Sequence, residues 1–175
     1  MPDRKPYRES CQVLKDQQLL EGDTLPELPG RAPRYDDEQL GVSFFRTQLA
    51  GARLEGLTLP RTFFGRSEIR GVSFRGTDLS ESTGCWNDFV DVDFGEADLS
   101  GVDLRGSIFQ RVSFRAAVLR GADLRRTSFG GCTFADADLT GAKLSRSLLW
   151  LFRLSAAQRR SVDWQSGPGP EPDGG

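Results

Sequence analysis

One apolar residue recurs at every fifth position through the middle of the chain. From Phe44 to Leu149 each fifth residue is Leu, Phe or Ile, and Gly84 is the one exception. The residue two positions earlier is almost always small or β-branched. A period of five matches neither the α-helix, with about 3.6 residues per turn, nor the alternation of a β-strand. Because so short a repeat cannot bury its apolar residue alone, we expect successive copies to stack into a solenoid around one continuous core.

A stricter period of twenty residues lies inside the period of five. Residues twenty apart sort by type, as they would if each coil had four corners and the coils were stacked. One column of fifth residues is entirely leucine: Leu59, Leu79, Leu99, Leu119 and Leu139. One column of residues two positions before the centres is entirely polar: Thr47, Ser67, Asn87, Ser107, Thr127 and Ser147. We therefore expect four faces per coil and one edge whose polar side chains bond backbone groups at a corner.

Six of the five-residue units read GTDLS, EADLS, GVDLR, GADLR, DADLT and GAKLS. In these units the chain resembles the pentapeptide-repeat family, whose consensus is A(D/N)LXX, over about residues 42–154. The resemblance implies an all-β fold, a right-handed quadrilateral parallel β-helix. The 22 units between Val42 and Leu151 correspond to about five and a half coils. At roughly 4.8 Å per coil, the shaft would be about 26 Å long.

The segment before the repeat is expected to cap it. Residues 1–41 do not keep the register. Within them Glu9–Glu21 has the composition of a helix, and the prolines that follow favour loop structure. We expect this N-terminal segment to cover the first coil.

The segment after the repeat is expected to contain a short helix and a tail. Ser155 is a typical N-cap for a helix at Ala156–Val162, so residues 155–164 are predicted to be a capping helix. Residues 165–175 are rich in Pro and Gly and are expected to be disordered. The apolar stretch just before Ser155 either caps the core or forms a homodimer seam at the C-terminal end, as the family resemblance also implies. The residues expected in that cap or seam are Leu148, Trp150, Leu151 and Phe152.

The composition argues against an enzyme. The chain has no histidine, which removes the commonest acid–base catalyst and metal ligand. No glycine-rich phosphate loop and no cysteine pair with zinc spacing occurs, so we expect no cofactor. The three cysteines, Cys11, Cys85 and Cys132, are read as free thiols of a reducing compartment. With no signal pattern and no apolar run of about 20 residues, a cytoplasmic protein without a membrane span is expected.

The charges of the repeat fall into two blocks. Eight acids and no Lys or Arg occur from Asp78 to Asp103, and six arginines against one acid occur from Arg105 to Arg126. In coils of twenty residues these blocks become an acidic belt and a basic belt beside it. The belts either neutralise each other between coils or meet a partner. The neighbouring acids argue against direct binding of nucleic acid by the arginines.

Four aromatic residues fall on outward positions of the repeat: Phe45, Phe63, Trp86 and Trp150. Exposed aromatics are enriched at interfaces, although packing under the N-terminal segment explains Phe45 and Phe63 equally well. Trp86 follows the break at Gly84, which is a bulge, a vacancy filled by a neighbour, or a dent used for binding. Arg66 is expected over the Trp86 indole.

These features favour a non-enzymatic, rigid scaffold that binds a protein partner. The predicted contact residues are Trp86, Asp78, Asp88, Asp91, Asp93, Glu96 and Asp98. The alternative is an enzyme or a small-molecule binder that uses a dent at Gly84 with Cys85, Asp88 and Asp91, but surrounding carboxylates raise the pKa of a thiol and disfavour a nucleophilic Cys85.

The resemblance also implies an alternative partner. Members of the family protect DNA gyrase and topoisomerase IV by imitating DNA phosphates with outward carboxylates, which confers resistance to topoisomerase poisons. Residues 42–154 carry 15 Lys and Arg against 13 Asp and Glu, a net charge of +2, so the shaft is not wholly acidic. Asp78, Asp98 and Asp138 share a column, but Val118 interrupts it.

Overall fold

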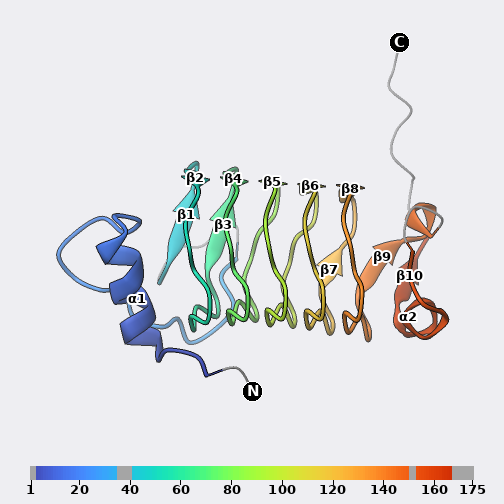
Figure 1. Cartoon of the computed structure of the whole chain (residues 1–175), viewed down its shortest axis with the longest axis horizontal. Helices are drawn as coiled ribbons and strands as arrows, with labels where there is room; N and C mark the ends of the chain where they lie inside the picture. The colour runs from blue at the N-terminus through green and yellow to red at the C-terminus, as the bar shows by residue number, and fades with distance from the viewer. Residues whose placement is uncertain (1–2, 35–40, 150–152, 167–175) are drawn as a thin grey trace, which may run out of the picture.

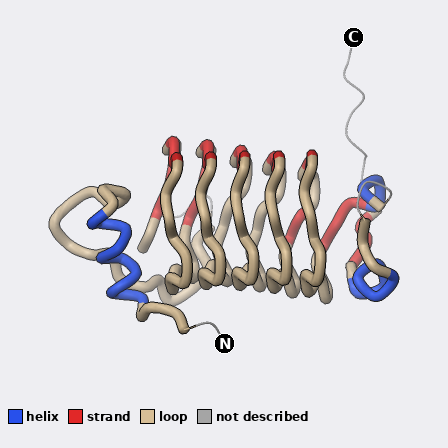
Figure 2. Tube along the Cα trace, in the orientation of Figure 1, coloured by secondary structure: helices blue, strands red, loops and turns tan. Residues whose placement is uncertain are grey.

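The computed structural model of the chain describes residues 3–34, 41–149 and 153–166. Short parallel strands and turns wind into a stack of coils, with helix α1 (Tyr7–Asp16) at one end and helix α2 (Ala156–Ser161) at the other (Figure 1). Turns and loops make up most of each coil (Figure 2). The predicted parallel β-helix is confirmed, as a solenoid of about 6 turns.

Two of the four faces carry the strands. The first face contains β1 (Ser43–Phe45), β3 (Phe63–Gly65), β7 (Asp123–Leu124), β9 (Lys143–Ser145) and β10 (Asp163–Gln165). The second face contains β2 (Gln48–Ala50), β4 (Glu68–Arg70), β5 (Asp88–Val90), β6 (Ile108–Gln110) and β8 (Ser128–Gly130). Single bridges through Thr83 and Asp103 join β3 to β7. Paired residues in neighbouring coils are twenty apart, as the columns predict.

Isolated bridges with the same spacing hold the other two faces. Asp93 lies on the third face, between Ser73 and Ser113. Asp78 and Asp98 lie next to each other on the fourth face. Each coil therefore has four sides although only two of them carry regular strands.

A left-handed backbone residue makes each corner. The residue two positions after each centre has a positive φ, without a break from Arg46 (φ 50°) to Gly141 (φ 68°). Glycine adopts this conformation freely, whereas any other residue is strained by roughly 1–2 kcal/mol. The corners that a period of five requires thus occupy one fixed position of the repeat.

Stacked phenylalanine rings fill much of the core. One ladder contains Phe74, Phe94, Phe114 and Phe134. Its successive ring centroids are 5.2, 5.4 and 4.8 Å apart. A second ladder contains Phe89, Phe109 and Phe129 and meets the first edge to face. Both geometries suit the ring quadrupole, and each such pair adds about 0.5–1.5 kcal/mol beyond the burial of its area.

The polar column satisfies backbone groups at the corner between the first and second faces. Asn87 Oδ1 accepts a hydrogen bond from the Ser67 amide at 2.9 Å. Asn87 Nδ2 donates to the carbonyls of Phe64 and Cys85 at 3.3 and 3.2 Å. Ser107 Oγ in turn accepts from the Asn87 amide at 3.1 Å. The predicted role of this column is confirmed.

Helix α1 closes the N-terminal end of the core. Its buried residues are Ser10, Cys11 and Leu14. Ser10 Oγ accepts a hydrogen bond from the Thr58 amide at 2.9 Å, which satisfies a donor of the first coil. The helix ends at Asp16 rather than near Glu21, because Gln18 turns into the left-handed region (φ 61°).

The rest of the N-terminal segment crosses onto the next coils. The carbonyl of Pro29 accepts a hydrogen bond from Arg61 Nη1 at 2.7 Å. The carbonyl of Pro33 accepts one from Thr83 Oγ1 at 2.5 Å. This segment therefore lies over more of the shaft than the first coil.

Helix α2 and strand β10 close the C-terminal end. Ser155 is the N-cap, as predicted: its Oγ accepts from the Gln158 amide at 3.1 Å, and Gln158 Oε1 accepts from the Ser155 amide at 2.9 Å. Gln158 Nε2 also donates to the carbonyls of Phe134 and Ala137 at 2.8 and 3.0 Å. The helix ends at Ser161, and β10 then pairs with β9, so part of the expected helical cap is a strand.

The regular coil stops earlier than the expected end at Leu154. A 3₁₀ helix, η1 (Arg146–Leu148), follows β9, and it buries Leu148 while leaving Leu149 half-buried. The predicted cap or seam residues Trp150, Leu151 and Phe152 lie outside the described residues, as does most of the predicted tail.

Candidate functional site

Trp86 is the most exposed large apolar side chain among the described residues. Its side chain is 57% exposed, and its backbone occupies a corner between the first and second faces with φ 60°. The indole lies over Gly106 in the next coil, where an added Cβ would come within 2.6 Å of the ring. The prediction that Arg66 sits over this indole is wrong, because the cation–π contact among the described residues joins Arg46 to Phe45 instead.

Arginines flank Trp86 on both sides along the shaft. An open depression on its N-terminal side is lined by Arg46 and Arg66. A second depression on its C-terminal side is lined by Arg105, Arg125 and Arg126. Glu68 and Asp88 also line the first depression, so its charges are mixed, whereas every charged residue that lines the second is an arginine.

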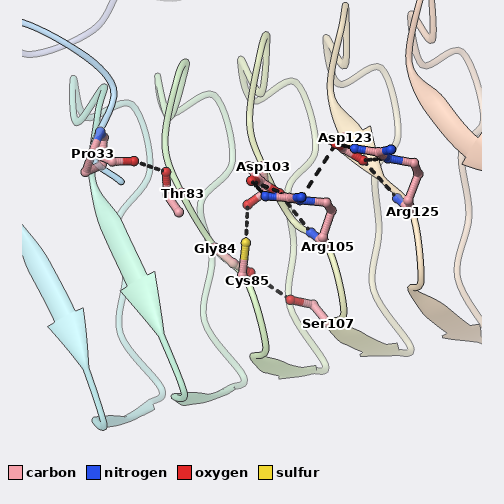
Figure 3. A network of polar contacts seen from close by, with 9 residues as sticks. All are labelled: Pro33, Thr83, Gly84, Cys85, Asp103, Arg105, Ser107, Asp123 and Arg125. Atoms are coloured by element: carbon pink, nitrogen blue, oxygen red, sulfur yellow. Dashed lines mark hydrogen bonds and ion pairs between the residues drawn. The ribbon is translucent and has the colours of Figure 1, made fainter. Parts of the chain in front are cut away.

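The five arginines differ in their partners. Arg105 Nη2 lies 2.8 Å from Asp103 Oδ2, and Arg125 Nη2 lies 2.7 Å from Asp123 Oδ2 (Figure 3). Arg105 Nε is also 3.8 Å from Asp123 Oδ2, so the four residues form one network. The hydrogen bonds and charge of the two carboxylates raise the pKa of both guanidinium groups.

The other three arginines share a column with Trp86 and form no ion pair within the described ranges. Arg46, Arg66 and Arg126 are exposed and stand at the same corner position in three different coils. We call Arg46, Arg66, Trp86 and Arg126 the basic corner. The sequence predicts the same column through its twenty-residue spacing, interrupted at Gly106 and continued to Arg146, but Arg146 lies in η1 rather than at a left-handed corner.

Gly84 is neither a bulge nor a dent. The twenty-residue pairing runs through Thr83 without an inserted residue. An added Cβ at Gly84 would come within 2.7 Å of Leu104 Cδ2, so the vacancy is filled by a leucine of the next coil. Ser107 Oγ donates to the Gly84 carbonyl at 2.7 Å and fixes it further (Figure 3). Of the three interpretations, the filled vacancy is the one observed.

Cys85 is poorly suited to nucleophilic chemistry. Its side chain is buried, and Sγ lies 3.9 Å from the Asp103 carbonyl oxygen. Burial and then the charge of Asp103 raise the pKa of the thiol to about 12. The thiol therefore keeps its proton at neutral pH, where a nucleophile needs the thiolate.

The predicted acidic residues do not gather at one place. Asp78 and Asp98 lie on the fourth face and Asp93 on the third. Asp91 and Glu96 form other corners of the coil. They surround the shaft as a belt, so no face collects more than a few of them.

Asp88 is the one predicted acid that lies beside Trp86. It is exposed in β5 on the second face, and it lines the same depression as Arg46 and Arg66. Ile108, its partner in β6, is a second exposed apolar side chain, with 42% of its surface exposed. Ile108 was missed from the sequence, although its position before a centre already placed it outward.

Several of the other acids are already paired or bound to the backbone. Arg111 Nε donates to Asp91 Oδ1 at 2.6 Å, and this hydrogen bond is the main cause that lowers the pKa of Asp91. Arg75 forms an ion pair with Glu96 in the next coil. The carboxylates of Asp78, Asp93 and Asp98 accept from amides two residues on. Mutual neutralisation between coils is therefore observed for Asp91 and Glu96.

The remaining outward aromatics are less available than predicted. Phe63 is buried, with its ring packed over Gly65 and its centroid 6.0 Å from that of Phe45. Phe45 stays 43% exposed under the Arg46 guanidinium. Trp150 lies outside the described residues.

Metal-binding clusters and membrane-spanning helices are two further features that bear on function. No group of three or more His, Cys, Asp or Glu in the described ranges is placed to hold a metal ion. No helix in the same ranges is long and apolar enough to cross a membrane.

Comparison with protein families finds one match. The family model for pentapeptide repeats matches residues 47–83, 88–125 and 113–150, with eight copies. The matched stretches leave out residues 84–87, where Trp86 lies. Among curated protein sequences, none matches the chain significantly.

Several solved structures are similar to the chain. HetL, a pentapeptide repeat protein involved in heterocyst differentiation regulation from the cyanobacterium Nostoc sp. strain PCC 7120, has a TM-score of 0.55 at 23% identity over 57% of this chain and 48% of HetL. A pentapeptide repeat protein from the Arabidopsis thaliana thylakoid lumen is 30% identical over 67% of this chain and 78% of its own, with a TM-score of 0.35. QnrB1, a plasmid-mediated fluoroquinolone resistance protein, is 16% identical over 70% of this chain and 79% of its own, with a TM-score of 0.30. The chain spans about half the length of HetL, and that likeness shows the fold alone.

Proposed function

This chain belongs to the pentapeptide-repeat family, and from that premise we propose that it is a rigid, non-enzymatic scaffold that binds a protein partner through the basic corner. The observation that carries the proposal is the exposed Trp86 held over Gly106. Tryptophan and arginine are the residues most enriched among those that dominate binding energy at protein interfaces. The basic corner combines both on one edge of the shaft.

The rigidity of the shaft supports a binding role. Trp86 is fixed by its corner backbone and by contact with the next coil, so little side-chain freedom remains to be lost on binding. Asn87, directly after it, is buried and hydrogen-bonded on both sides. A partner would thus meet a preorganised surface.

Capture of a partner from a lysate of the source organism tests this proposal. Immobilised protein is compared with the Trp86→Gly variant, because glycine suits the left-handed corner and the fold is kept. Ala116→Gly, a glycine at another exposed corner, is the matched control. We expect at least about a tenfold loss of the captured protein with Trp86→Gly and none with Ala116→Gly, as for loss of an interface hot spot.

The opposite result is equally clear. If mass spectrometry identifies the same partner at the same yield with Trp86→Gly as with the native chain, the basic corner is not the binding surface. If no protein is captured above the level of an unrelated solenoid, the scaffold proposal itself is overturned.

A further inference from the structure

We propose that the basic corner binds an extended, acidic segment of a protein, with carboxylates on Arg46, Arg66 and Arg126 and one apolar side chain on Trp86. This inference rests on the proposed function and names the chemistry of the partner.

The four corners of the coil differ in the type of residue that occupies the left-handed position. At other corners Arg61 Nε lies 2.7 Å from Glu81 Oε2, and Asp91 is bonded to Arg111, in each case in a neighbouring coil. Asp136 is a charged corner residue that forms no ion pair within the described ranges. Many further corners are glycine, which is free of strain. In the basic corner the left-handed backbone is occupied by three arginines and a tryptophan. The arginines have no internal ion pair to offset this strain.

The left-handed backbone does not distinguish this corner, because Ala116 and Asp136 adopt it as well. What distinguishes it, among the described residues, is a set of three unpaired guanidinium groups in one column with an exposed tryptophan. Arg46, Arg66 and Arg126 are exposed and lack a carboxylate partner within residues 3–34, 41–149 and 153–166. Carboxylates of a partner would supply the missing charge in charge-assisted, planar pairs.

The spacing along the corner fits an extended chain. At about 4.8 Å per coil, Arg46 and Arg126 are four coils or roughly 19 Å apart. Six residue steps of an extended strand span about 20 Å, and alternate side chains point the same way. Acids at the first, third and seventh positions therefore match the three arginines. An apolar residue at the fifth position meets the indole over Gly106.

The neighbouring acids favour a peptide over nucleic acid. Asp88 is exposed beside Trp86, and it would repel a continuous phosphate backbone. The flanking Arg105 and Arg125 are already bound to Asp103 and Asp123, so they add little free positive charge. Discrete carboxylates with neutral residues between them can avoid Asp88.

Binding of a defined probe tests the inference. The probe is a fluorescein-labelled heptapeptide, Glu-Ser-Glu-Ser-Phe-Ser-Glu, followed by fluorescence anisotropy with the full chain. The comparator has Gln in place of each Glu. We expect binding of the acidic probe and at least about a tenfold weaker affinity for the comparator, since three charge-assisted contacts are lost.

Variants locate the binding on the shaft. Arg66→Gly and Arg126→Gly are each expected to weaken the probe about fivefold, the upper range for an exposed ion pair, and together about 25-fold. Arg111→Gly removes the same charge from another corner and is expected to stay within about twofold. An equal loss with Arg111→Gly would show that general charge, not the basic corner, holds the peptide.

Two further outcomes would overturn the inference. One is no binding of the acidic probe at millimolar concentration. The other is tighter binding of a ten-nucleotide oligothymidylate with the same dependence on Arg66 and Arg126, which would assign the corner to nucleic acid. If the peptide fails while partner capture still depends on Trp86, the proposed function stands and only the acidic-segment inference falls.

Discussion

Ala116 and Gly121 occupy successive corners of one coil with the same left-handed backbone, at φ 55° and 65°. We expect Ala116→Gly to raise the free energy of unfolding by about 0.5–1 kcal/mol. Relief of left-handed strain, roughly 1–2 kcal/mol, exceeds the extra freedom that glycine gives the unfolded chain, roughly 0.4–1 kcal/mol. We expect Gly121→Ala to lower the same free energy by about 1 kcal/mol, because nothing lies within 4 Å of the added Cβ and only the backbone is strained.

Urea denaturation followed by circular dichroism measures both corner variants. The two changes must have opposite signs if the corner backbone is strained for every residue except glycine. A shift in the same direction for both would show that the corners relax around an alanine.

At the same scale, the sequence identifies Gly84 as a break but not its consequence. The fifth-residue rule marks the missing side chain, whereas the filling atom, Leu104 Cδ2, depends on a rotamer in the next coil. For the same reason Trp86 could be assigned to the surface, but not to a position over Gly106. Both contacts join side chains of neighbouring coils, so they depend on how two repeats pack together and not on the sequence of either repeat alone.

Asn87 lies in the middle of the polar column, and its side chain forms hydrogen bonds with backbone groups of the preceding coil. Replacement by Val removes the acceptor for the Ser67 amide and the donor for two buried carbonyls. Each unsatisfied buried group costs about 1–3 kcal/mol, so we expect Asn87→Val to lower the free energy of unfolding by about 3 kcal/mol or more. Asn87→Ser, which restores the residue found one coil away on either side, is expected to cost about 1 kcal/mol.

Thermal and urea unfolding of the two Asn87 variants separates hydrogen bonding from packing. A valine variant as stable as the serine variant would mean that backbone groups at this corner find other partners.

The two ends of the shaft show which elements the sequence can predict. The capping helix follows from Ser155, because an N-cap and its reciprocal Gln158 are local signals. Strand β10 was missed, although Val162 and Trp164 stand twenty residues after Ala142 and Leu144 and so resume the register. Helix α2 lies before β10, so the five-residue pattern is lost there although the twenty-residue spacing between β9 and β10 is kept.

At the scale of the whole molecule, the charges alternate along and around the shaft. Arg111 and Arg75 reach across coils to Asp91 and Glu96, and Arg120 pairs with Asp138. Of these contacts, the one between Arg111 and Asp91 joins the basic belt to the acidic belt. No face of the described shaft presents a row of free carboxylates comparable to the phosphates of a DNA strand. The acids within one coil are distributed over its different faces and corners.

This charge arrangement predicts that the chain does not act on type II topoisomerases by DNA mimicry. Each strand of DNA carries one negative charge for about every 3.4 Å of its axis, whereas the fourth face offers Asp78 and Asp98 one coil apart, roughly 4.8 Å, and then Val118. We expect micromolar protein neither to inhibit DNA gyrase supercoiling nor to protect the enzyme from a quinolone.

The variant Arg75→Gln/Arg111→Gln, which frees the carboxylates of Glu96 and Asp91, is the sharper control. These two acids still lie on separate corners, so we expect the variant to be inactive as well. Inhibition by the native chain would restore the mimic, and inhibition by the variant alone would show that pairing between coils, rather than the spacing of the acids, is what prevents it.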